Sequence, residues 1–384
     1  IGDKCIQIFA DSFRGCSCLT SVTLGQQVKK LSNNMFAGSS ITELVIPGSV
    51  NTIENDVFHG CKNLTTITFE PSPEGTALTL GYDTDGDDEN LFQDNNVLTT
   101  LNLDREIVYA MNVVDTPAKG PFGDMSSLTS VTLGDQVKTL HPFMFAGTGI
   151  TAINLNKVET IGNGAFINTA IPSLTVPGYV NTIGNDVFNG CTALTSLVFK
   201  PSTSSTALTI GYNTIGNDDG PFIDCPLTSV SVNREISYTF PTGDLDTPAE
   251  GLFGGKSSLA NVTIGDDVRT LLPYMFANSP ITGINLNKVT TIGKATFEGA
   301  TSLASLNIPA SVTTIDNFAF KNCSSLATLN FVSGTSNLVI GYQPDTDQRG
   351  PFYQSPLKSI KLDRPIAMSA SYTTNCNQWD EGIF

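Results

Sequence analysis

Charged residues, histidine and tryptophan are scarce in this sequence, and each shortage excludes a class of protein. Asp, Glu, Lys and Arg together make up 15% of the 384 residues, against about 25% in an average soluble protein. Two histidines leave little room for a histidine-based metal or catalytic site, and one tryptophan argues against a platform for stacking sugars. The 36 acidic and 20 basic residues give a formal charge of −16, which is the wrong sign for binding nucleic acid.

Membrane spans and local catalytic motifs are also missing. The chain has no uninterrupted run of eighteen apolar residues, so we expect no membrane-spanning helix. It lacks the His-Glu-x-x-His, Gly-x-Ser-x-Gly, Walker and Gly-x-Gly-x-x-Gly motifs. The two histidines, His59 and His141, occupy turn positions that other residue types fill elsewhere in the chain. We therefore predict that the protein is not an enzyme.

What the sequence does contain is a short repeat. A phrase of the form Leu/Ile-x-x-hydrophobic-x-hydrophobic starts fourteen times, and its alternating end is typical of a strand with one buried face. A second phrase, Val-x-x-Ile/Leu-x-x-x-x-Phe, follows most copies of the first. Its phenylalanines recur every 21–23 residues in short coils and every 30–34 residues in long coils. They are Phe13, Phe36, Phe58, Phe92, Phe122, Phe145, Phe166, Phe188, Phe222, Phe253, Phe276, Phe297, Phe320, Phe352 and Phe384.

A repeat of this size cannot bury its own apolar face, so the copies must stack around a continuous core. We predict a β-rich solenoid that occupies residues 1–384 as a single domain. It would be a right-handed coil or arc of about fourteen stacked coils with parallel strands and few helices. Gly81-Tyr82 returns as Gly211-Tyr212 and Gly341-Tyr342, which indicates three super-repeats at approximately 13–121, 122–252 and 253–384.

One coil carries a family resemblance. Residues 303–323 read Leu-Ala-Ser-Leu-Asn-Ile-Pro-Ala-Ser-Val-Thr-Thr-Ile-Asp-Asn-Phe-Ala-Phe-Lys-Asn-Cys. This resembles the BspA-like leucine-rich repeat, the type-5 class found in bacterial surface proteins, and similar coils cover nearly the whole chain. The resemblance implies a leucine-rich-repeat solenoid that is secreted or exposed at the cell surface, often as an adhesin that binds host extracellular-matrix proteins. The opening residues Ile1-Gly2-Asp3-Lys4 include no basic segment and no apolar segment, so we expect that an export signal is absent from this chain.

The cysteines follow the repeat. Five of the eight lie three residues after a repeating phenylalanine: Cys16, Cys61, Cys191, Cys225 and Cys323. Other coils have Ser or Thr at this position, so we expect a small buried site in which the thiol donates weakly to a turn carbonyl. A disulfide between Cys5 and Cys18, or between Cys16 and Cys18, is an alternative for the N-terminal cysteines.

The long coils are the best candidates for binding. Their extra residues fall between the second strand and the phenylalanine, so each super-repeat carries two adjacent long loops, and insertions at one angle of a solenoid often mark a binding face. Candidate binding residues are the tyrosines beside these loops: Tyr82, Tyr109, Tyr212, Tyr238 and Tyr342. Alternatively, these rings only pack the loops on each other. Asp83, Asp85 and Asp87 have the spacing of a calcium loop, with a solvated acidic loop as the alternative.

These features predict a non-enzymatic cell-surface or secreted protein without a cofactor, calcium excepted. It would serve adhesion or protein–protein interaction through an extended repeat face and the loop pairs. Its partner would be a protein, such as a host extracellular-matrix protein or another surface protein. A structural stalk for another domain and a glycan-binding module are the alternatives. Open solenoid ends also predict end-to-end self-association, or irregular capping by residues 1–18 and 369–384.

Overall fold

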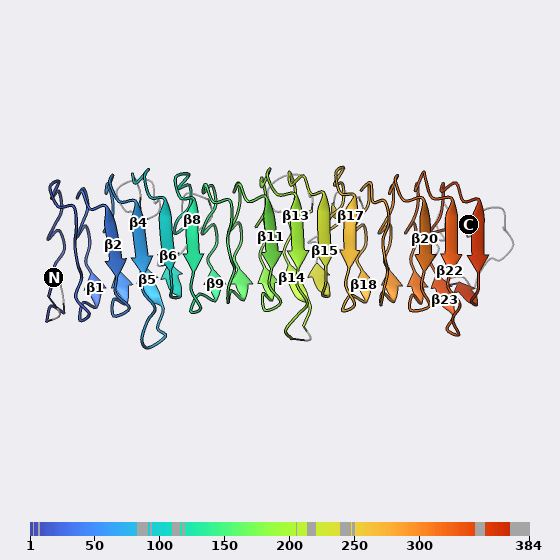
Figure 1. Cartoon of the computed structure of the whole chain (residues 1–384), viewed down its shortest axis with the longest axis horizontal. Helices are drawn as coiled ribbons and strands as arrows, with labels where there is room; N and C mark the ends of the chain where they lie inside the picture. The colour runs from blue at the N-terminus through green and yellow to red at the C-terminus, as the bar shows by residue number, and fades with distance from the viewer. Residues whose placement is uncertain are drawn as a thin grey trace. The chain divides into compact units, whose positions relative to one another are not determined.

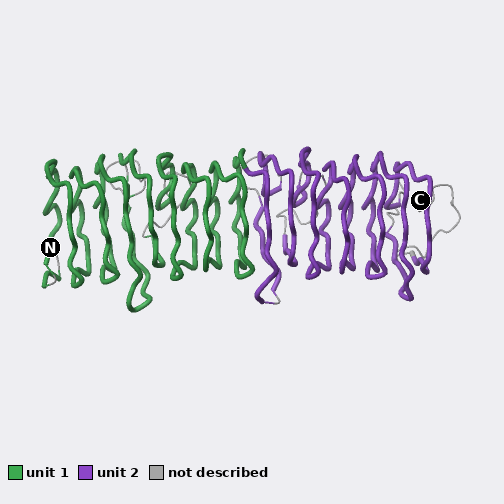
Figure 2. The backbone as a smooth tube through the Cα atoms, in the orientation of Figure 1, with its two compact units in different colours: residues 1–193 green, residues 194–384 purple. Residues whose placement is uncertain are grey.

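The computed structural model describes residues 1–2, 4–6, 8–82, 91–92, 94–109, 116, 120–204, 206–212, 220–238, 247, 250–341 and 350–368. The chain divides into two compact units, unit 1 (residues 1–193) and unit 2 (residues 194–384) (Figure 2). The described residues of both units form strands and turns, and none of them lies in an α-helix. In this part of the chain, no helix long and apolar enough to cross a membrane is found.

In unit 1 the first phrase of the repeat forms four-residue strands and the second phrase forms shorter ones (Figure 1). The four-residue strands are β2 (Glu43–Ile46), β4 (Thr66–Phe69), β6 (Thr100–Leu103), β8 (Ser130–Leu133) and β11 (Ser173–Val176). The shorter strands are β1 (Lys30–Leu31), β3 (Thr52–Ile53), β5 (Leu78–Leu80), β7 (Ile107–Tyr109), β9 (Thr139–Leu140), β10 (Thr160–Ile161) and β12 (Thr182–Ile183). Strands β2-β4-β6-β8, β1-β3-β5-β7 and β9-β10-β12 pair in these orders, always in parallel.

Unit 2 repeats the arrangement. Its four-residue strands are β13 (Ser196–Phe199), β15 (Ser229–Val232), β17 (Asn261–Ile264), β20 (Ser305–Ile308), β22 (Thr328–Phe331) and β24 (Ser359–Leu362). Its shorter strands are β14 (Leu208–Ile210), β16 (Ile236–Tyr238), β18 (Thr270–Leu271), β19 (Thr291–Ile292), β21 (Thr314–Ile315), β23 (Leu338–Ile340) and β25 (Ile366–Met368). Parallel pairing joins β13-β15-β17, β20-β22-β24, β14-β16 and β18-β19-β21-β23-β25. The predicted β-rich solenoid of stacked parallel strands is confirmed.

The alternation within each strand explains why the coils stack. In β4, Ile67 and Phe69 are fully buried while Thr66 and Thr68 are half-exposed. Parallel pairing places Ile67 beside Leu44 of β2 on one side and Leu101 of β6 on the other. Apolar side chains therefore line up from coil to coil on the inner face, because side chains alternate between the two faces of a strand. The threonines remain on the outer face.

The repeating phenylalanines form a stacked column inside each unit. In unit 1, neighbouring rings from Phe13 to Phe188 lie 5.2–6.4 Å apart between centroids. In unit 2, neighbouring rings from Phe222 to Phe352 lie 5.2–5.8 Å apart. The planes are nearly parallel, which is a favourable stacked geometry for aromatic pairs at this range of distances. The constant position of one ring in every coil is the physical origin of the phenylalanine period.

The turn around each phenylalanine needs left-handed backbone conformations. Residues two positions before or after the ring have a positive φ, and most of them are Gly, Asn or Asp, which tolerate it. Three bulky aromatics share this conformation: Phe143 (φ 53°), Tyr274 (φ 51°) and Phe318 (φ 57°). Phe143 packs against Ala146 and Ile167, and Tyr274 packs against Ala277 and Ala295. Burial of these rings offsets the backbone strain that such residues normally incur.

Candidate binding surface

The long loops leave in pairs from adjacent paired strands, with one such pair in unit 1 and two in unit 2, after β14 and β16 and after β23 and β25. In unit 1, β5 ends at Leu80, which pairs with Tyr109 at the end of β7, and Tyr82 follows two residues after Leu80. In unit 2, Ile210 pairs with Tyr238 in the same way, and Tyr212 follows two residues after Ile210. The loops therefore start side by side within each unit, as their sequence positions predicted. Tyr342 lies outside the described residues.

The four candidate binding tyrosines that the structure describes differ in burial and in what they contact. Tyr109 is buried, with 8% of its surface exposed, whereas Tyr82 and Tyr212 are half-exposed. The Tyr238 hydroxyl donates to the Glu250 carbonyl (3.0 Å), and so joins the two ends of the second long loop. Burial, followed by the nearby Glu250 charge, raises the pKa of Tyr238 above its ordinary value. Tyr109 and Tyr238 thus stabilise the start of a loop, and Tyr82 and Tyr212 offer more surface to a partner.

Three buried arginines lie in this region, and the sequence analysis did not predict their burial. Arg105 and Arg234 are completely buried and Arg364 is 7% exposed. Arg105 donates to the carbonyls of Val50 (2.7 Å), Gly48 (3.3 Å) and Thr76 (3.0 Å). Desolvation by burial lowers the pKa of each of these guanidinium groups from its ordinary value. The recurring phrase Arg-Glu-Ile was the available signal, but a repeated arginine is normally expected on the surface.

These arginines hold a second class of loop, here called the edge loops: residues 70–77 in unit 1 and residues 200–207 and 332–337 in unit 2. The first of them, between β4 and β5, extends beyond the ends of the strands (Figure 1). Thr76, which accepts from Arg105, belongs to it, and Ser336, which accepts from Arg364 (3.0 Å), belongs to the last. Arg234 contacts Ser202 of the middle edge loop (3.4 Å). Each arginine therefore fixes an edge loop to the neighbouring coil.

The glutamate after the arginine also has a structural role. The Glu106 carboxylate accepts from the backbone N–H groups of Lys138 (2.5 Å) and Thr139 (3.2 Å). Glu235 accepts from the backbone of Arg269 and of Thr270 in the same manner. These carboxylates satisfy strand donors of the next coil. Recurrent acidic residues in this frame are therefore part of the scaffold.

The cysteine column behaves as predicted at four of its five positions. Cys61, Cys191 and Cys323 are buried, and their thiols donate to the carbonyls of Phe36 (3.1 Å), Phe166 (3.0 Å) and Phe297 (3.1 Å) of the preceding coils. Cys225 is also buried. The prediction is wrong for Cys16, which is exposed because no described coil stacks in front of the Phe13 turn. Cys16 and Cys18 are free thiols, so neither of the alternative bridges forms.

Among the described residues, no group of three or more His, Cys, Asp or Glu side chains is arranged to hold a metal ion. The candidate calcium ligands Asp83, Asp85 and Asp87 lie outside the described residues. His141 lies in its turn with Nε2 2.7 Å from the Ile107 carbonyl, a contact that orients the ring within the scaffold.

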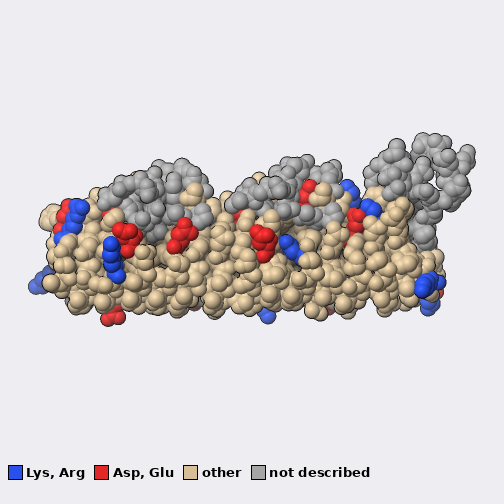
Figure 3. All heavy atoms as spheres, turned by 90° about the horizontal axis from the view of Figure 1, so that it is seen from above, with Lys and Arg blue, Asp and Glu red and all other residues tan. Residues whose placement is uncertain are grey.

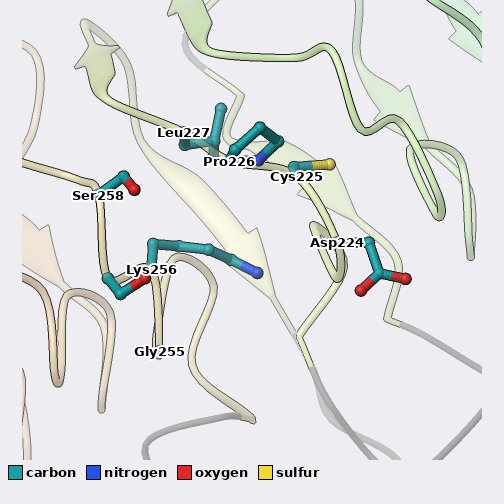
Figure 4. A pocket seen from close by; sticks show the side chains of 8 residues that line it. Asp224, Cys225, Pro226, Leu227, Gly255, Lys256 and Ser258 are labelled. Atoms are coloured by element: carbon teal, nitrogen blue, oxygen red, sulfur yellow. The ribbon is translucent and has the colours of Figure 1, made fainter.

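A small cleft lies between two adjacent turns of unit 2 (Figure 4). Its volume is about 250 Å³, and its walls are residues 224–227 of one turn and residues 255–258 of the next. The turns follow Phe222 and Phe253, the phenylalanines that end two adjacent long coils of this unit. The cleft therefore adjoins the C-terminal ends of both long loops.

Comparison with known proteins agrees with this architecture. The model of the BspA type leucine rich repeat region matches six copies, over residues 1–77, 118–239 and 222–342. The chain belongs to the BspA-type leucine-rich repeat family. Comparison with curated proteins found no match.

Solved structures of several leucine-rich repeat proteins are similar to this BspA-type chain. A leucine-rich repeat protein from Bacteroides ovatus is 22% identical, with 94% of this chain and 77% of that chain covered and a TM-score of 0.44. A leucine-rich cell surface protein from Faecalibacterium prausnitzii is 20% identical, with coverages of 91% and 86% and a TM-score of 0.35. The pneumococcal vaccine antigen PcpA is 20% identical, with coverages of 92% and 78% and a TM-score of 0.34.

The outer face of the BspA-type strands is a second candidate surface. On β4, β6 and β8 the outward side chains are hydroxyls and one amide: Thr66, Thr68, Thr100, Asn102, Ser130 and Thr132. Some outward side chains bind each other across the coils: Asn102 Nδ2 donates to Thr68 Oγ1 (3.1 Å), and on β15 and β13 of unit 2 Ser229 Oγ donates to Ser196 Oγ (3.0 Å). Figure 3 shows that charged residues are widely spaced on the described surface in that view. Because these polar groups bond with each other, fewer of them are available to a partner, which favours a solubilising role for this face over a binding role.

Proposed function

We propose that this BspA-type chain is a non-enzymatic binding protein at the cell surface or in the extracellular medium. Its partner is a protein, in the class of host extracellular-matrix or other surface proteins, and adhesion is the expected role. The loop pairs make the contact, and the stacked coils act as the scaffold that spaces them.

One observation carries the proposal. The same pair of loop origins, with Leu80 paired to Tyr109 and Ile210 paired to Tyr238, is built once in unit 1 and again in unit 2. A scaffold needs only short turns, because the short coils stack with four residues between Ile53 and Phe58. The additional residues therefore have no evident task in stacking, and exposed loops on a rigid scaffold are where binding residues concentrate.

The test removes the loops and keeps the coils. Deleting residues 83–89 and 112–119 of unit 1, or 213–219 and 241–250 of unit 2, leaves four residues before each phenylalanine, as in the short coils. Intact and shortened proteins are used to capture partners from extracellular-matrix and surface-protein preparations. Shortened proteins with unchanged circular dichroism and at least tenfold weaker capture support the proposal.

A matched control changes the strand face instead. Thr100→Lys and Thr132→Lys place charge on β6 and β8 without altering a loop, and we expect them to leave capture unchanged. Unaltered capture by the shortened proteins would favour a structural stalk.

A further inference from the structure

The cleft between residues 224–227 and 255–258 offers opposite charges from its two walls. Lys256 extends from its own turn toward the turn that carries Asp224 and Cys225 (Figure 4). Its ammonium group donates to the Phe222 carbonyl (2.7 Å), which fixes the position of the charge. Asp224 supplies the carboxylate on the opposite wall. Ser257 and Ser258 add hydroxyls that can both donate and accept.

This charge arrangement discriminates between classes of side chain. A carboxylate that enters the cleft is attracted by Lys256 and repelled by Asp224. A cationic side chain is attracted by Asp224 and repelled by Lys256. A carboxamide avoids both conflicts, because its oxygen accepts from an ammonium group while its NH₂ group donates to a carboxylate. A neutral amide is also free of the long-range repulsion that the net charge of −16 exerts on an anion.

The size and place of the cleft indicate where the amide comes from. Small-molecule sites usually occupy about 300–1,000 Å³, and this cleft of about 250 Å³ lies just below that range. It adjoins the ends of the two long loops that follow β14 and β16, which are among the proposed contact elements. A partner held by those loops would bring a side chain to the cleft.

We propose that this cleft binds the carboxamide of a glutamine or asparagine side chain from the protein partner, and thereby sets specificity at the loop pair that follows β14 and β16. The inference rests on the proposed function for its source of the side chain. Unit 1 differs at the decisive position, since Met125 occupies the place of Lys256 in the equivalent turn after Phe122. The amide site is therefore a property of unit 2.

The test uses short peptides and the full chain. The blocked peptides Gly-Gln-Gly, Gly-Glu-Gly and Gly-Lys-Gly share their backbone amides and differ only in the central side chain. Titration is followed by ¹H–¹⁵N chemical shifts of Cys225, Gly255 and Lys256. We expect saturable shifts with Gly-Gln-Gly and about tenfold weaker binding of the other two peptides. The reason is that one charged group of the cleft repels the charged central side chain of each.

Two variants complete the test. Lys256→Met reproduces the residue of unit 1, and Asp224→Asn keeps a residue type that tolerates the positive φ at this turn, as Asn278 does. Each should weaken Gly-Gln-Gly about tenfold, because each removes one charged hydrogen-bond partner. Equal binding of the three peptides, or unchanged Gly-Gln-Gly binding by both variants, would overturn the inference. Neither result bears on loop-dependent partner capture, so failure of this inference is distinguishable from failure of the proposed function.

Discussion

At the scale of single residues, the buried arginines donate the hydrogen bonds that buried backbone carbonyls need and that apolar side chains cannot supply. The Arg105 guanidinium joins three carbonyls from two places: Gly48 and Val50 in one turn, and Thr76 in an edge loop. A buried carbonyl without a donor destabilises a fold by about 1–3 kcal/mol. The arginine therefore stabilises the edge loop although its own desolvation is unfavourable.

Replacing Arg105 with methionine tests this role. We expect the free energy of unfolding to fall by about 2–4 kcal/mol, because the side-chain volume is largely kept while the carbonyls lose their donor. Urea unfolding followed by circular dichroism measures the change. Arg14→Met is the control, since Arg14 is exposed and makes only a surface ion pair with Asp11. Equal stability of the two variants would show that the Arg105 hydrogen bonds contribute little.

The buried thiols predict a pH dependence. Burial is the main cause that raises the pKa of Cys323 from 9.0 to about 12, and hydrogen bonds from Ala300 and Ser355 oppose it. Because the folded pKa is the higher one, this thiol's contribution to stability is complete below pH 9 and is lost as the pH rises toward 12. The Cys323→Thr variant, which copies Thr169 of a sister coil, should lose less stability than the natural chain between pH 8 and pH 11. Parallel losses in the two proteins would refute the assignment.

At the scale of elements, the turns at the phenylalanine edge are held by close backbone contacts. A Cβ atom on Gly251 would lie 2.0 Å from the Tyr274 carbonyl oxygen of the next coil. Gly120 has the same relation to Phe143 in unit 1, at 2.1 Å. The glycine that ends the second long loop and the aromatic residue with a positive φ thus form a matched pair in both units.

Gly251→Ala should separate these two turns. We expect a loss of at least about 2 kcal/mol in the free energy of unfolding, because backbone must move to admit the methyl group. Thermal unfolding gives the comparison with Gly283→Ala, where an added Cβ meets nothing within 4 Å. A tolerated Gly251→Ala would mean that the two turns can move apart without cost.

The sequence pattern predicted the elements better than their connections. Alternating residues of the first phrase predicted four-residue strands such as β4, and the phenylalanine period predicted the ring column, because each depends on a spacing within one coil. Burial of Arg105 was not predictable, since its partners Val50 and Thr76 come from other coils. The exposed Cys16 depended on whether a coil stacks in front of it, which its local sequence does not encode. The positive φ of Phe143 contradicts the residue's own preference and is determined by packing.

At the scale of the whole molecule, the low charge content has a structural cause. Inner strand positions and the phenylalanine column are apolar, and outer strand positions carry hydroxyls and amides that bond across coils. Several charged residues make hydrogen bonds that hold the scaffold together, as the buried Arg105 and the half-exposed Glu106 do. The surface that remains for recognition is therefore concentrated at the loops and turns.

The central claim is that the loop pairs bind and the coils only present them. Equilibrium binding of a captured partner tests it most directly, using a protein that lacks all three loop pairs (the two pairs above, and residues 343–349 with 369–384) beside proteins that lack one pair each. We predict weaker binding after a single removal and a larger loss, more than about a hundredfold, after removal of all three, since linked contacts strengthen one another. Binding of the protein without loop pairs that equals binding of the intact chain would contradict the account.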